Sequence, residues 1–264
     1  MTHLLRAELF RIRTTRLWLW ALLAAVVFGG CFTALFTFVG PENFDPPMPP
    51  LSTAEGVRAM LGLGTVTLFV PTLIGTVAVT NEYQHHTISH TYLAVPRRGR
   101  VLTAKLLAFS LVGVGYALVA TGLILASLYG ATVTTGTQLG ASFGDVLIVL
   151  GANAAAMVAY TLIGAGIGAL VRNQIFAVVG VIAYFTLFEV LLLMVPGLNA
   201  VYPFLPGGAS AALTDFSYLT DTMYVETGVA TSLLSPAGGF AVLLAYAVVA
   251  GVVATATSLR RDVS

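Results

Sequence analysis

The chain has 264 residues, of which 58% are hydrophobic and 9% are charged, and its formal net charge is +1. Soluble domains usually carry about 25% charged residues, and a mean hydropathy of +0.93 leaves too little polar surface to cover a core of this size. Composition therefore excludes a soluble globular protein, and the long, continuous apolar runs exclude a β-barrel and predict an all-α integral membrane protein.

The first element, residues 1–16, is predicted to be an amphipathic helix along the inner membrane surface. Leu5, Leu9 and Ile12 share one helical face, and Arg6 and Arg13 lie on the other. This pattern favours an interfacial helix that buries its apolar face and attracts anionic lipids. The alternative is a basic tail without a fixed helix.

Six later stretches are long and apolar enough to span a bilayer, which requires about 20 residues. A kink is expected at Pro71 in the second stretch. Cys31, the single cysteine, lies inside the first; the apolar run continues past it, which argues against lipoprotein processing and a cleaved signal peptide. The six predicted spans are residues 17–39, 57–80, 105–129, 143–170, 174–195 and 236–259.

Basic residues give the predicted orientation. With six spans, the arginines before the first span, between the second and third, between the fourth and fifth, and at the C-terminus all fall on one side, with Arg58 as the exception. This side is expected to be cytoplasmic, with both termini. Residues 1–264 then form a single transmembrane domain with a cytoplasmic loop at 81–104 and a long outer loop at 196–235.

The cytoplasmic loop carries the densest group of polar residues. A short helix over about residues 82–94, stopped by Pro96, is expected there, and such a helix can dock into a groove on a soluble partner. The alternative is a simple connector. His85, His86 and His90 invite a metal hypothesis, but the set lacks a further ligand at useful spacing, so we assign no metal ligand.

In this loop a Glu is followed by a Thr-Ile pair, then by a Pro with basic residues and by a Lys that opens the third predicted span. This pattern resembles the loop after the second helix of ABC-2-type permeases of the actinobacterial kind, although His86 stands where that family usually has Gly. The resemblance implies a coupling helix that receives the power stroke of an ATPase. The coupling residues it implies are Glu82, Tyr83, Thr87, Ile88, Pro96, Arg97 and Arg98, with Lys105 at the start of the third span.

The resemblance also implies a function and partners. It indicates a permease of a bacterial plasma membrane that exports an amphiphilic or lipid-like substrate, such as a drug, peptide or lipid. The partners would be a separate ATPase subunit, a second permease copy or paralogue, and membrane lipids; no nucleic acid is expected. The chain itself would hold no cofactor, because ATP and Mg would bind the ATPase.

Glu189 is the one clear carboxylate within a predicted span, and Asn153 in the fourth span is a similar but weaker case. An acidic side chain at the centre of a spanning helix costs about 2.5–3.5 kcal/mol, so Glu189 is expected to face protein or water. It can serve either as a gate or substrate contact or as a local hydrogen-bonding group. Gly164 and Gly168, four residues apart in the fourth span, predict a close helix contact within the chain.

The outer loop begins with a segment too apolar for a free loop and too interrupted by Pro and Gly to span. We expect residues 198–213 to be re-entrant, entering the membrane from outside without crossing it; a folded surface loop is the alternative. The segment is similar to the short helices that cap the exit in ABC-2 permeases. Tyr202 and Phe204 therefore join Glu189 and Asn153 as candidate gate or pathway residues.

The chain is not expected to be an enzyme, because ATP hydrolysis is assigned to the separate partner subunit. The chain has no phosphate-binding loop, and its single lysine, Lys105, follows no glycine-rich turn. Two alternatives to an exporter subunit remain. One is a non-transporting membrane scaffold or sensor partner. The other is an intramembrane metalloenzyme built on the three histidines, although their position outside the spans argues against it.

Overall fold

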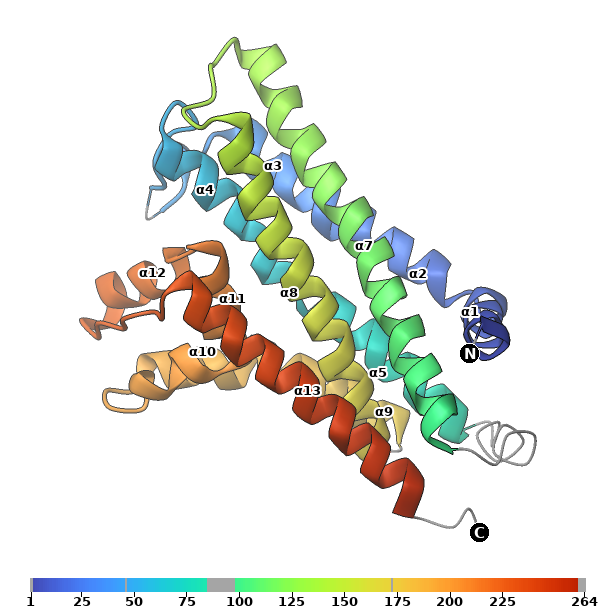
Figure 1. Cartoon of the computed structure of the whole chain (residues 1–264). Helices are drawn as coiled ribbons and strands as arrows, with labels where there is room; N and C mark the ends of the chain where they lie inside the picture. The colour runs from blue at the N-terminus through green and yellow to red at the C-terminus, as the bar shows by residue number, and fades with distance from the viewer. Residues whose placement is uncertain (1, 46, 85–97, 172, 261–264) are drawn as a thin grey trace.

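The computed structural model describes residues 2–45, 47–84, 98–171 and 173–260, and this part of the chain is helical without any strand. Within it, six helices are long and apolar enough to cross a membrane, which confirms the all-α membrane fold (Figure 1). The spans are Trp18–Val39, Ala54–Gln84, Thr103–Thr135, Phe143–Leu170, Gln174–Met194 and Pro236–Ala254.

Three spans are composed of several helical pieces, and three consist of one helix each. The first span contains a π-helical stretch, the second a 3-10 stretch and the fifth another π-helical stretch. In chain order, the composite spans are α2 (Leu17–Ala24), η1 (Ala25–Phe32) and α3 (Thr33–Val39); α4 (Ala54–Gly62), η3 (Leu63–Thr67) and α5 (Phe69–Gln84); and α9 (Gln174–Ala183), η4 (Tyr184–Phe188) and α10 (Glu189–Met194). The continuous helices are α7 (Arg98–Thr135), α8 (Phe143–Leu170) and α13 (Pro236–Arg260).

The second span breaks before Pro71, not at it. Pro71 lies in the first turn of α5, where its missing N–H leaves no intrahelical hydrogen bond unmade. The break is η3, and it follows from contacts with distant residues. A Cβ at Gly62 would lie 2.4 Å from the ring of Phe216, and one at Gly64 would lie 3.0 Å from Asn153 Oδ1. The kink expected at Pro71 is therefore a 3-10 segment one turn earlier.

Helices α5 and α8 form the centre of the bundle. In the most apolar stretch of the second span 67% of the residues are buried, against 17% in the fifth span. A Cβ at Gly75 would lie 2.0 Å from the carbonyl oxygen of Thr161, and one at Gly164 would lie 1.9 Å from that of Thr72. The Thr76 hydroxyl donates to the Gly164 carbonyl at 3.0 Å. The close contact predicted from glycines in the fourth span is confirmed.

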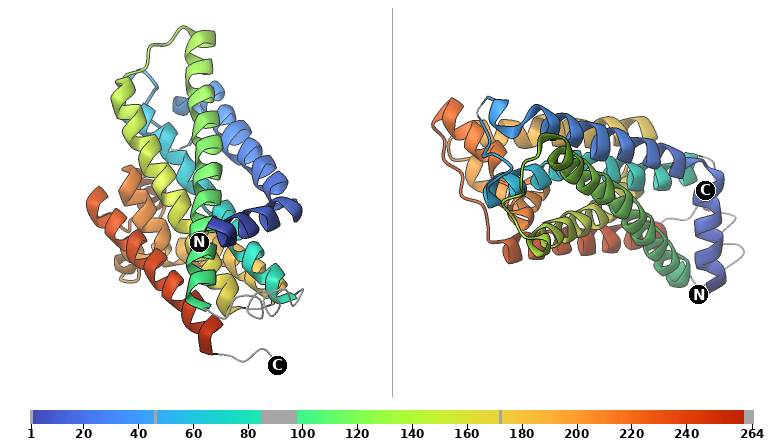
Figure 2. Two further views of the ribbon diagram at one scale, coloured as in Figure 1. Left: turned by 45° about the vertical axis from the view of Figure 1, so that its right-hand side comes forward. Right: turned by 90° about the horizontal axis from the view of Figure 1, so that it is seen from above.

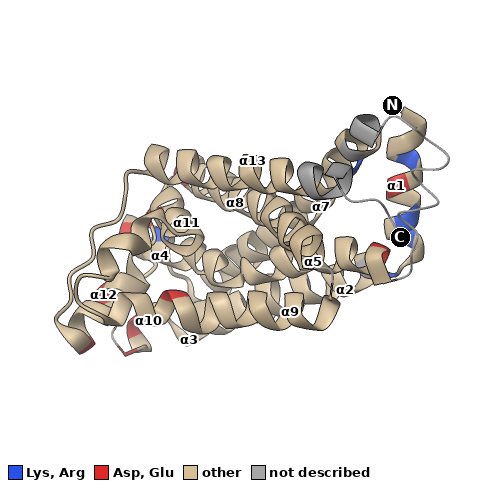
Figure 3. Ribbon diagram, turned by 90° about the horizontal axis from the view of Figure 1, so that it is seen from below, with Lys and Arg blue, Asp and Glu red and all other residues tan. Residues whose placement is uncertain are grey.

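The two ends of the bundle differ in charge. Figure 3 shows the described Lys and Arg residues gathered around α1 (Thr2–Thr14), whereas Asp and Glu dominate near α4, α10 and α12 (Tyr218–Thr227). The last residues of α13 lie at the same end as α1 (Figure 1). We call this the basic end. Arg58 of α4 is the exception predicted from the sequence, and it pairs with Asp215 at 3.6 Å.

Helix α1 runs across the spans at the basic end rather than along them (Figure 2). Its apolar face is used inside the protein. Ile12 is 7% exposed, and Leu5 and Leu9 pack with it against Val79 of α5 and Phe109 of α7. The protein, and not the bilayer, therefore buries the face that the sequence assigned to the membrane.

The segment between the fifth and sixth spans folds into short helices. They are η5 (Asn199–Phe204), α11 (Pro206–Thr214) and α12, and the short η2 (Pro41–Asn43) lies in the loop after the first span. Most of α11 is buried, including Gly208, Ala209 and Ser210. It packs on α13 and α8.

Candidate functional site

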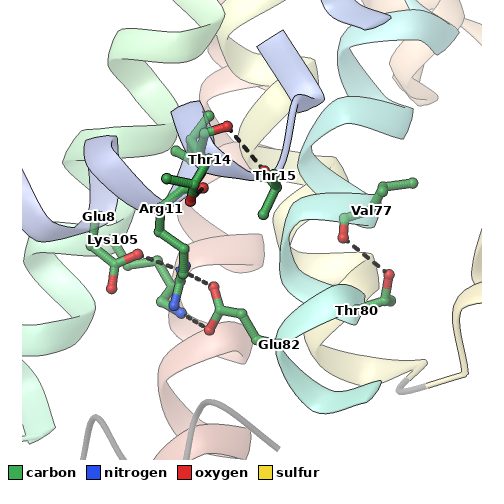
Figure 4. A network of polar contacts seen from close by, with 9 residues as sticks. Glu8, Arg11, Thr14, Thr15, Val77, Thr80, Glu82 and Lys105 are labelled. Carbon is green, nitrogen blue, oxygen red and sulfur yellow. Dashed lines mark hydrogen bonds and ion pairs between the residues drawn. The ribbon is translucent and has the colours of Figure 1, made fainter. Parts of the chain in front are cut away.

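Charged side chains from three helices meet at the basic end (Figure 4). Arg11 of α1 donates from Nη2 to Glu8 in its own helix and to Glu82 Oε1 in α5. Lys105 of α7 donates from Nζ to Glu82 Oε2. The Glu82 side chain is 3% exposed. Each of its oxygens has its own cation, and the carboxylate joins α1, α5 and α7. We call these four residues the charge cluster.

The two cations make the burial of Glu82 tolerable. An ionised carboxylate taken out of water without a partner costs several kcal/mol. Glu82 also lies in the last turn of α5, where the helix dipole disfavours negative charge by about 0.3–1 kcal/mol. Arg11 and Lys105 offset both costs, so removing either leaves a buried charge without full compensation.

Of the two acids in the charge cluster, Glu8 has the less complete compensation by nearby cations. It is 6% exposed, and burial raises the pKa of its carboxyl above the ordinary glutamate value. The nearby Lys105 and Arg11 cations offset only part of that rise, and the Glu82 carboxylate adds to it. The fold therefore binds the proton of Glu8 more tightly than the unfolded chain does.

Three of the residues assigned to coupling lie in the described part of the chain. Glu82 and Tyr83 occupy the last turn of α5, so the helix continues beyond the predicted end of the second span. Tyr83 packs beside the apolar cluster around Ile12. Arg98 begins α7, well before Lys105. Outside the described residues lie Thr87, Ile88, Pro96 and Arg97, and also His85, His86 and His90.

The predicted coupling set does not include Glu8 or Arg11, although the sequence carries a signal for Glu8. This residue follows Leu5 by three positions and precedes Ile12 by four, which places it on the apolar face of α1. An acid within an apolar face indicates a buried partner. That partner is Arg11, three positions further along the same helix, whereas the contact of Arg11 with Glu82 does not follow from the sequence because the two residues are 71 positions apart.

At the opposite end of the bundle, Glu189 supports the first turn of α11. It is 4% exposed, and its Oε1 accepts the backbone N–H of Gly207 at 3.1 Å. A Cβ at Gly207 would lie 1.9 Å from Glu189 Oε2, so a side chain at this position would displace the Glu189 carboxylate. The N–H groups of a first helical turn have no intrahelical acceptor and favour a negative charge. Glu189 thus caps α11 from a different helix, α10.

Tyr160 of α8 extends this contact. Its hydroxyl lies 3.2 Å from Ser210 Oγ, and Ser210 donates to the Gly207 carbonyl at 2.8 Å. Side chains from α8 and α10 therefore both support the first turn of α11, Glu189 directly and Tyr160 through Ser210. The sequence prediction missed Gly207 and Ser210, although a proline followed by two glycines at 206–208 is a signal for a helix start with little room around it.

Tyr202 and Phe204, both in η5, have different environments. Tyr202 is 3% exposed, and a Cβ at Gly208 would lie 2.0 Å from its carbonyl oxygen. Burial raises the pKa of the Tyr202 phenol, so the group stays neutral. Phe204 is 55% exposed. The structure brings Glu189 and Tyr202 to the first turn of α11 and leaves Phe204 on the surface.

Asn153 belongs to the break in the second span. It is fully buried, and its Nδ2 donates to the carbonyl oxygen of Leu61 at 3.0 Å. Leu61 lies where α4 gives way to η3, and a mid-helix 3-10 stretch often marks a hinge. Among the described residues, Asn153 Oδ1 has no hydrogen-bond partner. The amide thus holds one side of the break in place.

A cavity of about 430 Å³ opens near the Arg58–Asp215 pair. Its walls come from the proline-rich loop after the first span, from α4 and from α12. Phe216 lines it and also contacts Gly62 at the break in the second span. The cavity therefore borders elements that are connected to α11 and to η3.

A comparison of the sequence with known protein families found a match to one family. Residues 4–189 match the family described as ABC-2 family transporter protein. The matched region begins in α1, contains the whole charge cluster and the break in the second span, and ends at Glu189. A search among curated proteins found no match. Since the match covers well over half of the chain, this protein belongs to the ABC-2 family of transporters.

Proposed function

We propose that this ABC-2 transporter chain is the membrane-spanning subunit of an ABC exporter. It moves an amphiphilic or lipid-like substrate outward with the energy of a separate ATPase subunit, which binds ATP and Mg. The observation that carries the proposal is the charge cluster. Glu82 lies in the last turn of α5, which ends at Gln84 before residues 85–97, and it is joined to α1 and α7. Force applied to that segment by a partner would act on three helices together.

A continuous series of packed helices supports transmission from this end to the other. Helix α5 is held against α8 by the close glycine contacts at Gly75 and Gly164, and in the proposed cycle the two helices move together. Helix α8 carries Tyr160, which contacts Ser210 of α11. Such a series is a physical connection, and coupling through it has to be measured by substitution.

In the proposed cycle, the exit lies at α11. Residues 198–213 enter the membrane from outside without crossing it, and Glu189 and Tyr202 fix the first turn of α11 in the observed state. The 3-10 break beside Asn153 absorbs the change in direction of the second span when the exit opens. Phe204, exposed on the surface of η5, is a contact for substrate that leaves the exit.

The complete exporter contains a second permease, identical or paralogous, in a bacterial plasma membrane. The low burial of the fifth span, 17% in its most apolar stretch, supports contacts with another chain or with lipid. The arginines of the basic end support a cytoplasmic location for α1 and the C-terminus. The same end then meets the ATPase.

The test is reconstitution of the permease with the ATPase subunit encoded beside it. Purified complex in vesicles should hydrolyse ATP faster when amphiphilic substrates are added, and Glu82→Gln should reduce this stimulation. Glu226→Gln, an exposed residue of α12, is the matched control and should not. A permease that never retains an ATPase contradicts the proposal. Retention without substrate-dependent hydrolysis identifies a non-transporting scaffold or sensor partner instead.

A further inference from the structure

Helix α1 presents a second face that its internal packing leaves uncovered. Leu5, Glu8, Leu9 and Ile12 point into the protein, where the apolar residues pack with α5 and α7. The remaining face of the helix is therefore available to whatever surrounds the basic end.

This uncovered face is basic with one aromatic residue at its middle. Arg6, Phe10 and Arg13 follow at intervals of four and three residues, so they form one stripe along the helix. All three are exposed, and Phe10 is 67% exposed. The only acid in α1 is Glu8, on the buried face. Neither arginine of the stripe has a carboxylate partner among the described residues. We call Arg6, Phe10 and Arg13 the basic stripe.

The position of α1 places this stripe at the edge of the bilayer. Arg16 adopts a left-handed conformation with φ of 55°, and the chain turns there from α1 into the first span. Trp18 and Trp20 follow at once and are 46% and 68% exposed. Exposed tryptophans at the start of a span lie at the level of lipid headgroups, so α1 lies at the same level, across the side of α7 (Figure 2).

We propose that the basic stripe binds the headgroups of anionic phospholipids, with Phe10 inserted among the upper parts of their acyl chains. Charge complementarity supports this occupant, since arginines attract the anionic leaflet and no carboxylate of α1 opposes them. Each stripe arginine should increase the local preference for anionic lipid by roughly five-fold. The inference extends the proposed contact with lipids and does not depend on the ATPase.

The consequence for the fold concerns Arg11, which lies between Phe10 and Ile12 and reaches inward to Glu82. A lipid contact on one side of α1 and an ion pair on the other hold the helix in place together. Anionic lipid would thus stabilise the arrangement of the charge cluster without touching it.

The two tryptophans of the chain are intrinsic probes for this test, because both lie directly after the stripe. The purified full-length protein is placed, without ATPase or nucleotide, in vesicles of phosphatidylcholine and phosphatidylglycerol of fixed composition. Only one of the two lipids carries brominated acyl chains, which quench tryptophan fluorescence. Brominated phosphatidylglycerol should quench more than the same mole fraction of brominated phosphatidylcholine. The double variant R6Q/R13Q should lose this difference.

Arg58→Gln removes one arginine from the opposite end and is the matched control, which should keep the wild-type preference. Equal quenching by the two lipids in the wild-type protein would overturn the proposal. So would a preference that survives in R6Q/R13Q. If the double variant keeps its lipid preference but no longer retains the ATPase, the stripe is a surface for that partner instead. A failure of ATP-driven transport alone would leave every one of these readouts unchanged.

Discussion

Two glutamates in one cluster experience opposite environments. Each oxygen of Glu82 faces its own cation, whereas Glu8 shares Arg11 with Glu82. Burial raises the pKa of Glu8 because the local cations do not fully compensate for lost solvation. Replacing each carboxylate by an amide of the same shape should therefore have different consequences, a loss of stability at Glu82 and a change in the pH dependence of stability at Glu8.

At Glu82, we expect Glu82→Gln to destabilise the protein. The change leaves Arg11 and Lys105 together without an anion in a mostly buried site. Breaking a buried ion pair costs about 3–5 kcal/mol, and the lower end applies because the Arg11 side chain is 26% exposed. The unfolding midpoint of the purified protein in detergent should fall, while that of Glu226→Gln should not. Equal midpoints for all three proteins would show that the pairs contribute nothing.

At Glu8, we expect the stability of the wild-type protein to depend on pH, and we expect Glu8→Gln to abolish this dependence. A group with a raised pKa in the folded state contributes stability that is present below the unfolded pKa, about 4.3 for glutamate. That contribution to stability is lost as the pH rises through the raised pKa of Glu8 in the folded protein. Wild-type stability should therefore decline relative to Glu8→Gln over this interval, as measured by unfolding midpoints at a series of pH values. A constant difference between the two proteins would contradict the raised pKa.

At the scale of elements, α11 depends on a cap that another helix supplies. We expect Gly207→Ala to destabilise the protein by about 1–3 kcal/mol, because its Cβ would overlap Glu189. In a Glu189→Ala background the same change should cost much less, since the overlapping oxygen is gone. The non-additivity is measured by a double-mutant cycle of unfolding free energies.

Gly180→Ala is the matched control for this cycle. A Cβ at Gly180 meets nothing within 4 Å, and alanine favours a helix over glycine by about 1 kcal/mol. This variant should therefore be as stable as the wild type or more so. Additive effects of Gly207→Ala and Glu189→Ala would mean that Glu189 does not cap α11.

The sequence predicts the existence and order of the spans but not their interruptions. Hydropathy reports how much lipid-compatible surface a segment carries, and six segments carry enough to be recognised singly. The break in the second span instead depends on Asn153, 92 positions from Leu61, and on Phe216 beside Gly62. No local pattern contains these contacts. The kink is predicted at Pro71 because proline is the best local signal for a kink.

The same distinction applies to the candidate sites. Glu189 is predictable because a carboxylate within an apolar span is costly and needs a role, and Glu82 is assigned through the resemblance of its loop to ABC-2 permeases. Their partners are not predictable, since Arg11 and Gly207 approach through tertiary packing. For α1, the periodicity gives the correct apolar face, but the sequence cannot tell whether protein or bilayer covers it.

At the scale of the whole molecule, charge separates the two ends and gives a topology that can be tested. In a Cys31→Ala background, we expect Ser52→Cys to react with a membrane-impermeant maleimide on intact cells. Thr2→Cys should react only after permeabilisation. Both positions are exposed, so access to the reagent depends on the side of the membrane. The reverse pattern would invert the orientation and place the charge cluster outside, away from any ATPase.

The charge cluster also imposes an order on biosynthesis. Arg11 precedes Glu82 by 71 positions, and Lys105 follows Glu82 by 23. At ordinary synthesis rates, Arg11 waits on the order of ten seconds before both partners exist. Helix α1 can complete its ion pairs with the other helices only after the second and third spans have entered the membrane. Nascent chains truncated within the second span should leave α1 open to protease, and chains that include α7 should protect it. The ion pairs of docked α1 therefore require that the second and third spans have been synthesised and inserted.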